Sequence, residues 1–111
     1  MRDFADVKIE IFVPQDHVAQ LREKLGEIGA GRIGSYEHCM AVSIVQGSWR
    51  PLPGAHPFDG ETGKLSEAAE SKIEVNCKRE IVTDVLAVIR ENHPYEEPLI
   101  NIIPLVNHLF I

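Results

Sequence analysis

The sequence predicts an α+β domain built from two copies of a strand–helix–strand unit. Two observations predict it: the chain matches itself when shifted by 64 residues, and in both copies a strand-like alternation of apolar residues gives way to a helix-like spacing. The shift places the run Lys-Ile-Glu at 8–10 on the same run at 72–74. Because strand–helix–strand connections are right-handed, the two units interleave into a four-stranded antiparallel sheet with both helices on one face, the ferredoxin-like arrangement.

The elements of the first copy follow from its apolar pattern. Apolar and charged residues alternate over 7–13, which predicts a strand with one buried face. Apolar residues then recur at intervals of three and four over 18–28, which predicts a helix. Pro14 ends the strand, Gly29 ends the helix, and an apolar segment at about 35–45 forms the second strand.

The second copy repeats this order. Alternation over 72–77 predicts a strand, helical spacing over 82–89 predicts a helix that Pro94 ends, and another strand follows at about 99–105. A single domain therefore fills the chain, with the first repeat at about 7–45, a loop at 46–70, the second repeat at about 71–105 and an apolar tail at 106–111. The tail ends in Leu-Phe-Ile, and we expect another copy of the chain to cover it.

The stretch 46–70 is too long for an ordinary connection and is rich in glycine and proline. Loops of this length are usually functional, and this loop holds the single tryptophan, Trp49, beside Arg50. We expect a short extra strand at about 48–52 that pairs back on the residues before Gly47.

Composition narrows the function classes. The formal net charge of −6 disfavours nucleic acid as a partner, and no apolar run approaches the roughly 20 residues that span a membrane. The chain begins with acidic residues, where a secretion signal is basic and then apolar. We therefore expect a soluble cytoplasmic protein.

Two local patterns resemble functional motifs, a cysteine pair and a glycine-rich loop, but a structural role explains each of them better. Cys39 and Cys77 form no zinc-binding or redox pair by their spacing, and Cys77 continues a buried face, so core packing is expected. The glycine-rich run 29–34 follows a helix and precedes a strand, the reverse of a dinucleotide-binding loop. It therefore predicts a helix end, with Arg32 free to contact an anion or a neighbouring acid.

Three runs carry a resemblance to a known family: GAGRIGSYEHC at 29–39, WRPLPGAHPFDGETGKL at 49–65 and HPYEEP at 93–98. In order and spacing they resemble the inserted CutA/PII-like domain of the YqfO and NIF-three-like family, over nearly the whole chain. The resemblance implies the CutA- and PII-like version of the ferredoxin-like fold in a homo-oligomer, with a trimer favoured over a dimer. The family's dinuclear metal site and cyclohydrolase label belong to flanking domains, so catalysis is not carried over.

The candidate site lies where the long loop meets the HPYEEP run. In the predicted sheet the second strand ends and the last strand begins at the same edge, so the two segments meet there. The candidate ligand or interface residues are Trp49, Arg50, His56, His93, Tyr95, Glu96 and Glu97. The alternative is a stiff connection whose side chains pack on a neighbouring subunit. No catalytic residue is assigned and no metal site is expected; His93 and Glu96 are the candidates if a divalent metal binds.

These observations predict a non-catalytic oligomeric binding or regulatory module. We expect no cofactor, and we expect the partner to be a small ligand or a protein besides further copies of the chain. The alternative function is a divalent-metal-binding protein or a metal-dependent hydrolase whose site lies at the subunit boundary.

Overall fold

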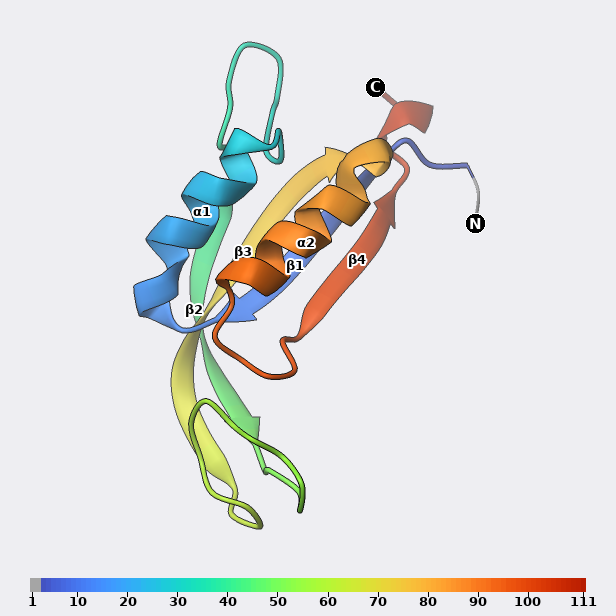
Figure 1. Cartoon of the computed structure of the whole chain (residues 1–111). Helices are drawn as coiled ribbons and strands as arrows, with labels where there is room; N and C mark the ends of the chain where they lie inside the picture. Colours follow the sequence, from blue (N-terminus) through green and yellow to red (C-terminus); the bar gives the residue numbers. More distant parts are fainter. Residues whose placement is uncertain (1–2) are drawn as a thin grey trace.

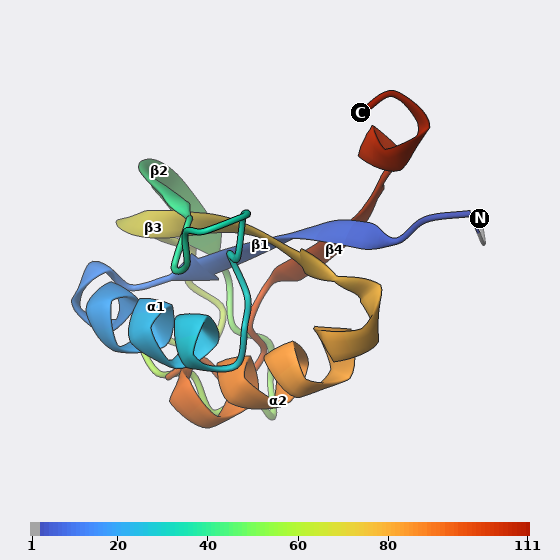
Figure 2. The ribbon, with the colours of Figure 1, turned by 90° about the horizontal axis from the view of Figure 1, so that it is seen from above.

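The structure is a computed structural model that describes residues 3–111. Four strands form one sheet in the order β2-β3-β1-β4, with every neighbouring pair antiparallel. The strands are β1 (Asp6–Val13), β2 (Ala41–Trp49), β3 (Ser66–Lys78) and β4 (Ile100–Leu105), and the helices are α1 (Val18–Glu27) and α2 (Val82–Asn92). Both helices cover the same face of the sheet (Figures 1 and 2). The predicted fold class is confirmed.

Short 3-10 turns complete the chain. Gln15–His17 precedes α1, Arg79–Ile81 precedes α2, and Asn107–Leu109 follows β4. This last turn lies beside the start of the chain, where His108 Nε2 is 3.4 Å from Asp3 Oδ1. Figure 1 shows this last turn and the start of β1 at the opposite end of the molecule from the β2–β3 hairpin.

The core lies between the sheet and the two helices. Alternate residues of β1 and β3 point into it. The apolar residues alternate in the sequence because the sheet buries only one of its faces. Buried apolar residues come from both strands and both helices: Val7, Ile9, Ile11, Val13, Leu21, Leu25, Ile73, Val75, Cys77, Val85 and Ile89. The predicted core packing of Cys77 is confirmed, and burial raises the pKa of its thiol. Both cysteines are free thiols.

The expected loop is shorter than the sequence suggested. Residues 46–49 and 66–70 belong to β2 and β3, which pair from Ala41 opposite Glu74 to Trp49 opposite Ser66. The expected extra strand at 48–52 was therefore wrong, because Ser48 and Trp49 simply complete β2. The register of β1 ends at Val13, opposite Ser71, so the last part of the hairpin projects beyond the sheet as a two-stranded arm.

The second strand also begins later than expected, at Ala41 rather than near residue 35. Residues 28–40 form a loop that projects beyond the end of α1 (Figure 1), and a β-bridge joins Ile33 to Tyr36 within it. Gly29 and Gly31 have φ of +100° and +78°, so the glycine-rich run ends α1 as predicted. Arg32 lies 3.7 Å from the Glu37 carboxylate, the acidic contact expected for it. Over residues 3–111, no helix is long and apolar enough to cross a membrane.

Candidate functional site

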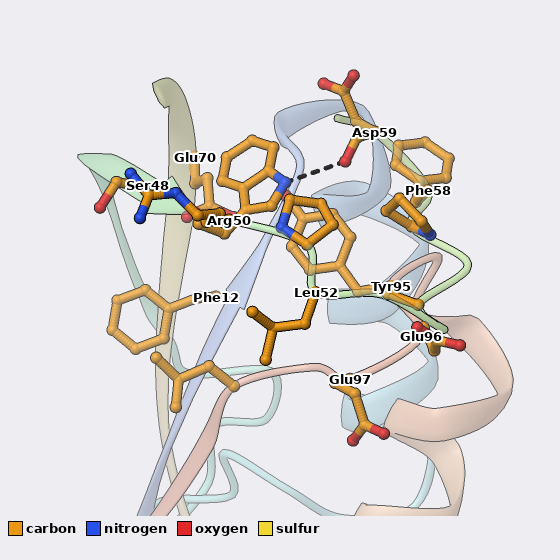
Figure 3. A pocket seen from close by; sticks show the side chains of 15 residues that line it. Phe12, Ser48, Arg50, Leu52, Phe58, Asp59, Glu70, Tyr95, Glu96 and Glu97 are labelled. Atoms are coloured by element: carbon orange, nitrogen blue, oxygen red, sulfur yellow. Dashed lines mark hydrogen bonds between the residues drawn. The ribbon is translucent and has the colours of Figure 1, made fainter. Parts of the chain in front are cut away.

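A cavity of about 400 Å³ lies at the base of the hairpin arm (Figure 3). Three segments enclose it: the β2–β3 arm, the loop 50–65 and the connection 93–99 between α2 and β4. Its apolar wall includes Phe12, Trp49, Leu52, Ala55, Phe58 and Leu99, and its charged groups are Arg50, Asp59, Glu70, Glu96 and Glu97. Of the seven candidate residues, five line this cavity, whereas His56 and His93 do not.

Strand directions explain why these segments meet. β1 and β2 both run antiparallel to β3, and β4 runs antiparallel to β1, so β2 runs toward the edge of the sheet at which β4 begins, and the loop 50–65 returns from the arm to that edge. Backbone contacts then fix the meeting point. The Phe12 N–H donates to the Leu99 carbonyl at 3.2 Å, and the His56 N–H donates to Glu96 Oε1 at 3.1 Å. The loop and the HPYEEP run therefore come together as the topology predicted.

Glu70 is a buried carboxylate in the cavity wall, only 8% exposed. The Tyr95 hydroxyl donates to its Oε1 at 2.6 Å, a charge-assisted hydrogen bond. Gly47 on the neighbouring strand makes room for it, because a Cβ there would lie 1.9 Å from Glu70 Oε2. Burial, and then the bond to Glu70, raises the pKa of Tyr95 well above that of a free tyrosine, so the phenol remains a donor.

Sequence reasoning missed Glu70 because it placed residue 70 in the loop. The outward face of β3 carries Lys72 and Glu74, and continuing that alternation backward by two residues reaches Glu70. That extension is the signal that could have found it. Nothing in the sequence indicates its bond to Tyr95, because the two residues belong to segments that only the folded sheet brings together.

His93 lies behind the cavity wall and joins the connection to β1. Its Nε2 donates to the Phe12 carbonyl at 2.7 Å, and its Nδ1 accepts the Tyr95 N–H at 3.1 Å. This bonding requires the neutral Nε2–H form, and burial lowers the pKa of the ring below its usual value. His93 therefore positions Tyr95, with neither nitrogen free for a metal. Across 3–111, no group of three or more His, Cys, Asp or Glu side chains could hold a metal ion.

Trp49 anchors the long loop to the arm. Its indole Nε1–H donates to the Asp59 carbonyl at 3.0 Å, the bond drawn in Figure 3. Gly60 allows this approach, since its φ is +107° and a Cβ there would lie 2.9 Å from the indole nitrogen. The Phe58 ring then lies 6.0 Å from the Tyr95 ring. Aromatic contacts thus link the loop to the connection across the cavity.

No family model matches the chain. A curated relative from Halalkalibacterium halodurans, named GTP cyclohydrolase 1 type 2 homolog, is 41% identical over 100 residues, which are 90% of this chain and 27% of that protein. The crystal structure of a Bacillus cereus protein related to NIF3 superposes with a TM-score of 0.82 at 33% identity. The resemblance to the NIF-three-like family is confirmed.

The match to NIF-three-like proteins covers one part of them. The Bacillus cereus structure aligns over 94% of this chain and 26% of its own, so the chain spans about a quarter of these relatives. A PII-like protein CutA from Nostoc aligns over 95% of this chain and 86% of its own, with a TM-score of 0.70 and 17% identity. That likeness shows that the fold is the CutA/PII-like one.

Proposed function

We propose that this NIF-three-like chain is a non-catalytic, oligomeric binding or regulatory module of the cytoplasm that takes a small ligand in the cavity at the arm. The observation that carries the proposal is the cavity itself, where two irregular segments far apart in the sequence meet. Loops and strand ends held by a rigid scaffold are where proteins place binding sites. A ligand there would connect the arm to the connection before β4.

The state of the polar groups supports binding without catalysis. Glu70 already accepts from Tyr95, whose raised pKa keeps it protonated at neutral pH. His93, two residues before Tyr95, has both ring nitrogens in hydrogen bonds to the backbone. Neither Tyr95 nor His93 is therefore free to act as a nucleophile or general base. The rest of the lining is mainly apolar surface and carboxylates.

Exposed apolar side chains away from the cavity support self-association. Ile102 and Ile103 of β4 are 43% and 39% exposed, and Leu109 and Phe110 beyond it are 57% and 81% exposed. β4 is also an edge strand of the sheet, whose free backbone groups can pair with another chain. We propose a homo-oligomer, with a trimer favoured over a dimer from the CutA resemblance.

Native mass spectrometry of the untagged chain, purified without chelator, tests both parts of the proposal. We expect an integral multiple of the chain mass carrying a retained small molecule. Ala55→Phe fills the cavity and should remove the retained mass, whereas Ala87→Phe, on the exposed face of α2, should keep it. A monomer would contradict self-association. Retention by Ala55→Phe would contradict the cavity as the site, and a mass lost on chelation would favour the metal-binding alternative.

A further inference from the structure

The charges around the cavity are strongly one-sided. Four carboxylates line it, those of Asp59, Glu70, Glu96 and Glu97, against the single guanidinium of Arg50. Within the described residues, no ion pair involves any of these five groups, although six other acidic side chains pair with a lysine or an arginine: Asp6, Glu10, Glu27, Glu37, Glu61 and Glu74. The cavity therefore combines four carboxylates with a single cation, Arg50, which forms an ion pair with none of them.

The acceptor at Glu70 is built into the fold and is not part of a solvated acidic surface. Glu70 is only 8% exposed, its Oε1 accepts from the Tyr95 hydroxyl, and its Oε2 lies against the backbone of Gly47. Removing a charged carboxylate from water is costly unless a partner compensates for it. A single hydrogen bond from an uncharged phenol compensates for this cost only in part, so a positively charged group that enters the cavity would be stabilised by the Glu70 carboxylate.

The rest of the wall excludes a bare ion. Phe12, Leu52 and Leu99 present hydrocarbon, and Trp49 and Tyr95 present aromatic rings. Hydrocarbon gains free energy only by covering other apolar surface, and aromatic faces attract cations electrostatically. A hydrated metal ion brings no apolar surface to cover the hydrocarbon, and an anion would face four carboxylates.

Building on the proposed function, we propose that the cavity recognises an organic cation: an apolar or aromatic body carrying one ammonium, amidinium or guanidinium group. The body lies against Phe12, Leu52 and Leu99, and the positive group is directed toward Glu70. Glu96 and Glu97, on the connection, provide the outer negative field.

Three probes of nearly equal shape test the charge requirement: benzamidine, which is cationic; benzamide, which is neutral; and benzoate, which is anionic. Each is titrated into the full chain while the fluorescence of the single tryptophan, in the cavity wall, is followed. We expect benzamidine to bind at least about 10-fold more tightly than benzamide, and benzoate most weakly, because a hydrogen bond to a charged group contributes at least about one decade of affinity.

Variants locate the positive group. Glu70→Gln keeps an oxygen that can accept from Tyr95 but removes the charge, and should weaken benzamidine about 10-fold while leaving benzamide unchanged. Glu67→Gln, an exposed acid on the same strand, is the matched control and should change neither. Glu97→Gln, exposed at the rim, gives a second measurement if Glu70→Gln folds poorly, and should weaken benzamidine by a smaller factor.

The outcomes separate the two proposals. Equal binding of all three probes, or tightest binding of benzoate, would overturn the cation requirement and leave the cavity as a binding site. A benzamidine preference that survives both Glu70→Gln and Glu97→Gln would overturn the assigned orientation. No response of the tryptophan to any probe would overturn both this inference and the proposed binding function.

Discussion

Replacing Tyr95 with phenylalanine tests the contact that joins the connection to the hairpin arm. The substitution removes one hydroxyl and leaves the ring in place, so Glu70 loses the donor that lies 2.6 Å from its Oε1 while remaining buried. A hydrogen bond to a charged group contributes about 1.5–3 kcal/mol, and the loss falls at the upper end when the charge stays buried. At an m value of about 1.5 kcal/mol per M, the urea midpoint should fall by about 1–2 M.

Urea unfolding at neutral pH and fixed protein concentration measures the loss, since self-association would make stability concentration-dependent. Tyr36→Phe is the matched control, because Tyr36 is the only other tyrosine and is 74% exposed. It should shift the free energy of unfolding by less than about 0.5 kcal/mol. In a double-mutant cycle with Glu70→Gln, the two changes should not add. Equal effects of the two tyrosine variants, or full additivity, would refute the reasoning.

Three further predictions follow from close contacts and burial. Gly26→Ala in α1 should lower the free energy of unfolding, because the new Cβ would lie 1.9 Å from the His38 ring. Alanine favours a helix over glycine by about 1 kcal/mol, so in a His38→Gly background the same change should raise the free energy of unfolding measured in urea. Gly60→Ala should lower stability and alter tryptophan emission more than Gly54→Ala, which shares a positive φ but has open space; equal effects would rule out crowding. Because the fold holds His93 in its neutral form and lowers its pKa, the unfolded protein binds a proton more readily than the folded one as the pH falls below 6.5. The free energy of unfolding should therefore decrease from pH 6.5 downward, and this decrease should be smaller in His93→Gln.

The sequence predicted the strands and helices that bury one face in the core, and it missed the two-stranded arm, which lies beyond the core. Strand β1 alternates strictly because α1 and α2 cover one of its faces. The arm has no such cover: residues 66–69 of β3, Ser-Glu-Ala-Ala, lie beyond the end of β1 and carry no apolar alternation. Its pairing with β2 comes from backbone hydrogen bonds, which leave no signature in side-chain type.

The candidate site was predictable as a place but not as a set of contacts. Strand directions alone placed the loop beside the connection, since they depend only on the order of elements. The roles of the residues there depend on atomic distances that the chain fixes on folding. His93 was predicted as a ligand or interface residue, and in the fold its ring bonds the backbone of β1. Glu70 was not assigned a role, and it holds the buried carboxylate. Gly47 gave no warning that its missing side chain makes room for that charge.

The contact between Asp3 and His108 means that the order of the elements along the chain could be changed without changing the fold. Because Asp3 lies next to His108, at the opposite end of the molecule from the hairpin, a short peptide could join these two positions, and new ends could be opened elsewhere in a circular permutant. Another polypeptide attached before Asp3 or after the turn Asn107–Leu109 would begin at this end of the molecule, away from the cavity. The loop 50–65 offers no such freedom, since an insertion there would separate Trp49 from Asp59.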